Sequence, residues 1–216
     1  KAELGGVCLN WGCIPTKALL KSAQVYDYMK HAGEYGITIA GEAKPDFAAV
    51  VKRSRTVAEG MSKGIQFLFK KNKIDVLQGY GKLAPGKSVT VAKNDGSTET
   101  FTADHIILAT GARSRELPNL KQDGKKIIGY REAMTLPELP TSMVVVGSGA
   151  IGSEFAWFYA AMGTKVTLVE FMPNIVPLED EEVSKQLERS FKKAGITVMT
   201  SSTVEKAEVK DNICHV

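Results

Sequence analysis

Two cysteines stand five positions apart near the start of the chain: Cys8 and Cys13, in the stretch GGVCLNWGCIPTK. A zinc site would need a second pair of ligands, but the third cysteine and the three histidines show no paired spacing. A structural disulfide across so short a loop would restrain little chain entropy. The pair therefore favours redox chemistry, and no metal site is expected.

The residues that flank the cysteines favour thiol chemistry. Gly5 and Gly6 leave the backbone beside the thiols open to a flat ligand. Cys13 comes just before a predicted helix with Lys17 near its start, so the helix dipole and the ammonium group are expected to lower the Cys13 pKa. A Cys13 thiolate would be an electron donor, while Cys8 would exchange with an incoming thiol or disulfide.

A glycine motif in the second half of the chain has the pattern G-x-G-x-x-G and stands between an apolar strand candidate and a predicted helix. Its residues are Gly147, Ser148, Gly149, Ala150, Ile151 and Gly152. The first glycine of such a motif makes a tight turn, the second lets the backbone approach a pyrophosphate, and the third allows close packing of helix and strand. This context predicts a dinucleotide site.

An acidic residue follows at the position where a dinucleotide fold places the ribose. Glu170 ends the next predicted strand, about twenty residues after the motif. Its carboxylate would accept hydrogen bonds from the ribose hydroxyls and would repel a 2′-phosphate. The sequence therefore favours NAD over NADP.

The first half of the chain predicts two helices followed by short strands. Apolar residues recur at helical spacing from residue 14 to about residue 33, and a second helix starts after Asp46, a favourable N-cap, and runs to residue 72. Turn residues separate strand candidates that predict a small antiparallel β-meander, at 74–79, 79–84, 88–92 and 99–103. The apolar run at 105–111 predicts a strand buried on both faces.

From residue 143 onward, strand and helix patterns alternate. Strands predicted at 143–147, 165–170 and 196–200 are separated by helices at 151–163 and 180–195. This order indicates an α/β fold with a parallel, doubly wound sheet. A connection that contains several prolines and one short helix near 131–136 precedes it, so the expected domains are 1–112 and 113–216.

Composition and charge exclude several classes of protein. Charged residues make up 24% of the chain, and its net charge of +4 is spread along the sequence, which argues against nucleic-acid binding. No apolar run reaches the eighteen or so residues that a membrane-spanning helix needs, so no membrane segment is expected. Three cysteines are too few for a secreted disulfide scaffold, which favours a reducing compartment.

Three stretches of the sequence resemble the flavin-dependent pyridine-nucleotide disulfide oxidoreductases, in the order in which that family has them. GGVCLNWGCIPTKALLKSA is similar to the family's redox-active disulfide segment, ATG at 109–111 to its second flavin-associated motif, and VVVGSGAIGSEFAWFYAAMGTKVTLVE to its NAD fingerprint. The resemblance implies two Rossmann-like nucleotide-binding domains, one for FAD and one for NAD, both incomplete in this chain, with the β-meander in the first.

The resemblance also implies roles for individual residues. Cys8 would be the thiol that exchanges with the substrate, and Cys13 the thiol that contacts the flavin. Lys17 would lie near the flavin ring and pair with Glu154, between the flavin and the nicotinamide. Further cofactor contacts are implied on the flavin side and at the NAD adenine, for Gly81, Thr110 and Gly111, and for Val204.

The cysteine stretch is most similar to the branch of the family that oxidises dihydrolipoamide with NAD as a component of 2-oxo acid dehydrogenase complexes. That branch implies a lipoyl domain and a second copy of the chain, as a homodimer, for partners. It also implies a location in the bacterial cytoplasm or the mitochondrial matrix.

Two alternatives to that activity are open. The first is another member of the family, such as glutathione reductase or mercuric reductase, although glutathione reductase typically uses NADPH, for which Glu170 is unsuited. The other alternative is a non-catalytic NAD-binding fragment. The family's first glycine motif and its His-Glu acid/base pair are not in this sequence, so an internal fragment of a longer protein is expected.

Overall fold

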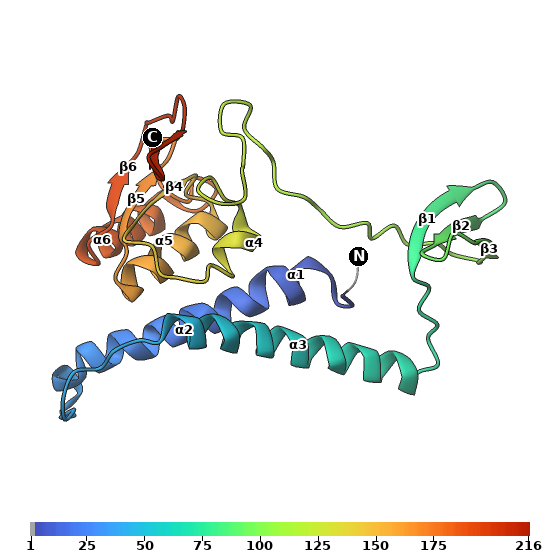
Figure 1. Ribbon diagram of the computed structural model, residues 1–216, viewed down its shortest axis with the longest axis horizontal. Coiled ribbons are helices and arrows are strands. Elements are labelled where there is room, and N and C mark those ends of the chain that lie inside the picture. Colours follow the sequence, from blue (N-terminus) through green and yellow to red (C-terminus); the bar gives the residue numbers. More distant parts are fainter. Residues whose placement is uncertain (1–2) are drawn as a thin grey trace.

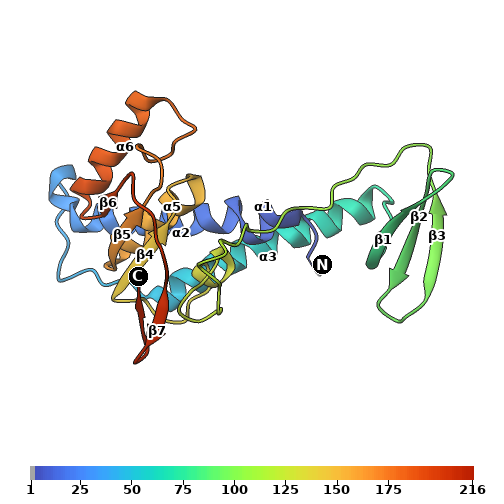
Figure 2. The same cartoon turned by 90° about the horizontal axis from the view of Figure 1, so that it is seen from above.

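Two long helices lie side by side in the computed structural model, which describes residues 3–216 (Figure 1, Figure 2). The short helix α1 (Gly6–Trp11) leads into α2 (Cys13–Lys30), and the 3-10 turn η1 (Ala32–Tyr35) and a loop connect α2 to α3 (Phe47–Lys71). The Asp46 side chain accepts a hydrogen bond from Ala49 N at 2.9 Å and caps α3, as the sequence predicts. The stretch that holds the cysteines is helical rather than an open loop.

A small antiparallel sheet follows α3 and lies apart from the rest of the molecule (Figure 1, Figure 2). Its strands β1 (Gly79–Ala84), β2 (Ser88–Lys93) and β3 (Thr98–Thr102) pair in the order β1-β2-β3, which confirms the predicted meander. The further strand predicted from residue 74 is wrong, because 74–78 has no regular secondary structure and no strand within residues 3–216 pairs with it.

The apolar run at 105–111 differs most from its prediction. It belongs to no strand, and the side chains of Ile107 and Leu108 are 90% and 67% exposed. A buried strand needs neighbouring strands that pair with its backbone groups. In the part of the chain that the structure describes, no strand lies beside this segment. The prediction of a buried strand is therefore wrong for this chain.

The second half forms a three-stranded parallel sheet in the order β4-β5-β6. Its elements are α4 (Tyr130–Ala133), β4 (Ser142–Val146), α5 (Ala150–Met162), β5 (Lys165–Val169), α6 (Glu181–Lys193) and β6 (Thr197–Met199), followed by a hairpin of β7 (Glu208–Lys210) and β8 (Ile213–His215). Strands and helices alternate as predicted, which confirms the α/β class. No helix within residues 3–216 combines the length and the apolar composition needed to cross a membrane.

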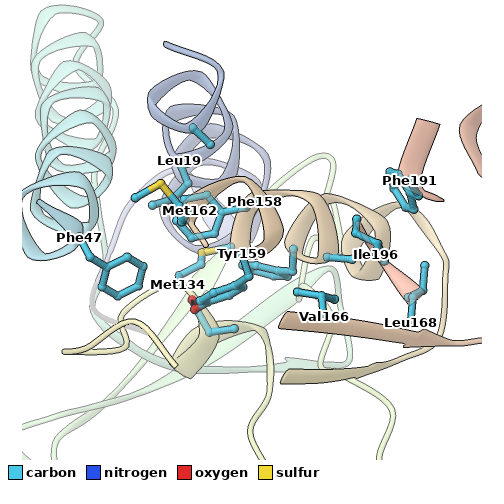
Figure 3. Close-up of a cluster of buried hydrophobic side chains, with 14 of the residues drawn as sticks. Leu19, Phe47, Met134, Phe158, Tyr159, Met162, Val166, Leu168, Phe191 and Ile196 are labelled. Carbon is cyan, nitrogen blue, oxygen red and sulfur yellow. Dashed lines mark hydrogen bonds between the residues drawn. The ribbon is translucent and has the colours of Figure 1, made fainter. Parts of the chain in front are cut away.

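One apolar core joins the first helices to the second half of the chain. Leu19 of α2 and Phe47 of α3 lie among the buried side chains of α5 (Figure 3). The centroid of the Phe47 ring is 6.2 Å from those of Phe158 and Tyr159, and the Tyr159 hydroxyl donates a hydrogen bond to the Ala133 carbonyl of α4. This core contains residues from both sides of the domain boundary expected at residue 112. The boundary itself stays a prediction.

Candidate functional site

Cys8 and Cys13 lie on two consecutive helices that meet at Gly12. Both are exposed free thiols, Cys8 on α1 and Cys13 at the first position of α2. A Cβ on residue 12 would lie 3.0 Å from Cys8 Cα and 3.1 Å from the Val7 carbonyl oxygen. Glycine therefore lets the two helices approach closely, and this joint keeps the two thiols near each other.

The Cys13 thiol is not activated in the way that the sequence predicts. Its pKa is raised, first because the hydrogen bond with the Cys8 side chain favours the neutral thiol, and then because of desolvation and the charge of a Cys8 thiolate. The charge of Lys17 lowers the Cys13 pKa, as expected, but less than these effects raise it. The prediction of a lowered Cys13 pKa is therefore wrong for the dithiol state.

Lys17 and Glu154 form an ion pair between α2 and α5. Lys17 Nζ donates a hydrogen bond to Glu154 Oε1, and the two side chains are 61% and 27% exposed. Lys17 lies one helical turn after Cys13, and Glu154 lies two positions after Gly152. The pairing that the resemblance implies is thus present in the structure. The roles of the pair beside a flavin and a nicotinamide stay predictions.

The glycine motif connects β4 to α5 by a tight turn. Gly147 has a φ of 96°, and a Cβ on residue 152 would lie 1.9 Å from the Gly147 carbonyl oxygen, so Gly152 lets the helix pack against the turn. A Cβ on Gly149 would meet nothing within 4 Å, which leaves this backbone open to a ligand. Ala150 and Ile151 begin α5, whose first N–H groups are suited to a pyrophosphate. Binding of that group stays a prediction.

Glu170 lies against the glycine motif and is only 7% exposed. Its Oε2 accepts hydrogen bonds from the backbone N and the hydroxyl of Ser148, each at 2.7 Å, and its Oε1 accepts one from Met172 N at 2.8 Å. Burial raises the pKa of the Glu170 carboxyl, but these hydrogen bonds outweigh it, so the pKa lies below its ordinary value. The carboxylate is therefore charged and fixed in place beside the motif.

Ser148 organises this site, although the sequence pattern marks it only as a variable position. It is fully buried, its hydroxyl also accepts a hydrogen bond from Val176 N at 3.1 Å, and its carbonyl accepts one from the Ser153 hydroxyl at 2.8 Å. A hydroxyl residue inside the motif, followed by an acid at the next strand end, is the signal that could have identified it.

A cavity of about 1120 Å³ lies beside the motif and β4. Gly147, Gly149 and Val204 are among the residues that line it, so the residue predicted at the NAD adenine shares a cavity with the motif. Asn119, in the long connection before α4, donates from Nδ2 to the Val204 carbonyl at 2.7 Å and so fixes that loop. No pattern in the sequence points to Asn119.

The residues predicted on the flavin side are not gathered into one site. Gly5 and Gly6 are exposed beside the cysteines, with φ values of 100° and 71°. Gly81 lies on β1, which Figure 1 shows apart from α1 and α2, and Thr110 and Gly111 lie in the exposed connection after β3. In the part of the chain that the structure describes, the residues predicted on the nucleotide side therefore lie together, and those predicted on the flavin side do not. That part of the chain also contains no group of three or more His, Cys, Asp or Glu side chains placed to hold a metal ion.

The chain is similar to proteins of one family over nearly its whole length. The model of the family described as pyridine nucleotide-disulphide oxidoreductase matches residues 2–216. The chain belongs to this family. Dihydrolipoyl dehydrogenase of Chlorobaculum tepidum is 52% identical over 212 residues, and that of Rhizobium etli is 47% identical over 222 residues. These matches cover 98% and 96% of this chain but 45% and 46% of the relatives, so the chain spans less than half of their length.

Solved structures agree with the family. LpdA from Mycobacterium tuberculosis matches with a TM-score of 0.86 and 27% identity, over 95% of this chain and 45% of that one. RclA from Escherichia coli, a flavoprotein disulfide reductase induced by HOCl, matches with a TM-score of 0.81 and 26% identity, over 99% of this chain and 44% of that one. The helices, the meander and the parallel sheet are therefore an arrangement that this oxidoreductase family shares.

Proposed function

We propose that this chain carries the thiol-exchange site and the NAD-binding site of a dihydrolipoyl dehydrogenase. The observation that carries the proposal is the exposed pair of thiols, Cys8 and Cys13, next to an ion pair with α5, in a family member whose relatives bear that name at 52% identity. The chain spans less than half of the length of those relatives, so the complete reaction is proposed for an enzyme of their full length.

The chain's own residues account for the oxidation of a dithiol. In the oxidised form Cys8 and Cys13 share a disulfide, and a substrate thiolate attacks Cys8 Sγ, which forms a mixed disulfide and releases the Cys13 thiolate. The second substrate thiol then attacks the substrate sulfur of the mixed disulfide and releases Cys8. Two electrons and two protons have passed to the cysteine pair, the substrate has become a cyclic disulfide, and the pair is in the dithiol state of the structure.

Residues near the thiols and near the glycine motif favour the re-oxidation of Cys8 and Cys13 from the dithiol to the disulfide. The charge of Lys17 favours the Cys13 thiolate that this return needs. FAD, when bound, supplies a two-electron relay between a dithiol and a nicotinamide. The open backbone at Gly149 and the fixed Glu170 carboxylate favour NAD, because a 2′-phosphate would meet a charge of its own sign.

We also propose the partners that this activity requires. Both cysteines are exposed, so a dithiol carried on the lipoyl domain of a 2-oxo acid dehydrogenase complex could reach them. A homodimer and a location in the bacterial cytoplasm follow from the same assignment, which is supported by relatives from bacteria such as Chlorobaculum tepidum and Rhizobium etli.

A single-turnover exchange assay tests the proposed activity. The oxidised chain is mixed with dihydrolipoamide under anaerobic conditions, and the lipoamide formed per chain is measured. We expect about one equivalent from the wild type and from the control Cys214→Ser, and none from Cys8→Ser or Cys13→Ser, because only the first two can hold the exchanging disulfide. A wild-type yield of lipoamide from Cys13→Ser would contradict the assignment.

A further inference from the structure

Trp11 lies between the two cysteines but has no part in the exchange proposed above. It ends α1, one residue before the joint at Gly12, and its side chain is half-buried. Two guanidinium groups lie over its ring, with Cζ of Arg55 from α3 at 4.0 Å from the centroid and Cζ of Arg131 from α4 at 4.8 Å. The indole thus connects the end of α1 to two elements that are far apart in the sequence.

Hydrogen bonds fix the same end of α1. Trp11 Nε1 donates to Glu3 Oε1 at 3.2 Å, and Arg55 Nη1 donates to the Asn10 carbonyl at 2.7 Å. Asn10 is buried, and its Nδ2 donates to the Leu4 carbonyl at 2.8 Å. The residues just before the Gly12 joint are therefore held by polar contacts as well as by packing.

Two positive charges at one indole distinguish this contact from ordinary apolar packing. The pKa of Arg55 is lowered first by burial and then by the charge of Arg131, while the Glu3 carboxylate raises it. The electron-rich face of an indole attracts a guanidinium and so offsets part of the repulsion between the two arginines. An aliphatic side chain at residue 11 would leave both cations without that partner.

Arg131 connects this contact to the nucleotide half of the chain. It belongs to α4, whose Ala133 carbonyl accepts a hydrogen bond from the Tyr159 hydroxyl of α5. The same helix α5 forms the ion pair with Lys17. The helices that carry the cysteines are therefore anchored to α5 on both sides of the joint, directly through Lys17 and by way of α4 through Trp11.

We propose that Trp11 is a positioning residue for the cysteine pair, whose stacking with Arg55 and Arg131 holds the end of α1 so that Cys8 and Cys13 stay within reach of each other. This role rests on the proposed exchange function of the pair. Two thiols that are held together form their disulfide more readily, because each is at a high effective concentration for the other. Loss of the stacking should shift the equilibrium towards the dithiol.

The equilibrium between the oxidised chain and dithiothreitol tests this role. Dithiothreitol reduces the disulfide to two thiols and becomes a cyclic disulfide, and alkylation followed by mass spectrometry gives the fraction of each form. In a Cys214→Ser background, we expect Trp11→Leu to shift the equilibrium constant about tenfold towards the dithiol. Trp11→Phe, which keeps an aromatic face, should shift it about threefold. The control Trp157→Phe, at the other tryptophan of the chain, should leave it unchanged.

The outcomes separate positioning from packing. An unchanged equilibrium constant in Trp11→Leu, together with a lower melting temperature, would overturn the proposal. If Trp11→Leu does not fold, Arg131→Gln, at an exposed side chain, is measured instead. We expect it to shift the equilibrium constant about threefold towards the dithiol. An unchanged constant in Arg131→Gln would also overturn the proposal. Failure of dihydrolipoamide to reduce the wild-type disulfide would refute the proposed function, while the dithiothreitol result would still decide the role of Trp11.

Discussion

The nucleotide side and the flavin side of the predicted centre differ in how much of their structure this chain builds. Around the glycine motif, Ser148 is fully buried, Glu170 is nearly so, and the hydrogen bonds to their side chains come from residues 148–176. On the flavin side, 105–111 is mostly exposed and belongs to no strand, and Gly81 lies on a separate sheet (Figure 1). The residues predicted on the nucleotide side come together because one segment of the chain supplies both strands and the turn between them, whereas 105–111 has no strand to pair with among residues 3–216.

The largest expected effect tests whether the nucleotide side is built by the motif itself. Gly152→Ala places a Cβ 1.9 Å from the Gly147 carbonyl oxygen, so the turn must open. We expect the free energy of unfolding to fall by about 3 kcal/mol, measured by urea denaturation. A loss of much less than this would show that the turn adapts easily and would weaken the contrast with the flavin side.

A matched variant of the same motif separates folding from binding. Gly149 has a φ of −59°, and an added Cβ would meet nothing within 4 Å, so Gly149→Ala should fold with a stability within about 0.5 kcal/mol of the wild type. It should nevertheless weaken NADH binding, because the methyl group stands where a pyrophosphate would approach the backbone. Wild-type affinity for NADH in this variant would place the pyrophosphate elsewhere.

A smaller effect, with a distinct pH dependence, is expected at Glu170. The folded pKa of this carboxyl is below its ordinary value of 4.5, so its contribution to stability is present above that pH and is lost as the pH falls through the folded pKa. Glu170→Gln replaces one carboxylate oxygen by an NH2 group, which is a donor and cannot accept the hydrogen bond from the N–H of Ser148 or of Met172. We expect it to cost about 2 kcal/mol at neutral pH.

The pH dependence of stability tests the interpretation of Glu170→Gln. The difference in unfolding free energy between wild type and Glu170→Gln should be constant near neutral pH and should shrink below pH 4.5. Glu179→Gln, at an exposed side chain on the loop before α6, should show no such difference. A difference that is independent of pH would mean that the fixed charge does not hold this site together.

The same contrast explains which parts of the structure could be predicted from the sequence. The cap at Asp46, the meander and the glycine turn depend on residues close in the chain, so local patterns are sufficient. The raised pKa of Cys13 depends on the distance to Cys8, and the stacking at Trp11 joins elements that lie far apart. The spacing of the cysteines does not give the geometry of the joint at Gly12, and no local pattern contains the contacts of Trp11, because tertiary packing sets them.

The smallest effect on stability is expected at Lys17, whose ion pair joins the cysteine helix to the nucleotide half. The pair is largely exposed on the lysine side, so Lys17→Gln should change the free energy of unfolding by less than about 1 kcal/mol. Its effect on chemistry should be larger, because the charge of Lys17 lowers the pKa of Cys13.

Alkylation of Cys13 by iodoacetamide at neutral pH measures that chemical effect. Without the charge of Lys17 the Cys13 pKa rises further, so a smaller fraction is thiolate and the reaction should slow about threefold. Lys21→Gln is the control one turn later, since Lys21 Nζ donates to Gln24 Oε1 and not to a group beside the thiols. An unchanged alkylation rate in Lys17→Gln would mean that the ion pair only holds the two helices together. The reactivity of the cysteines would then not depend on the contact with α5.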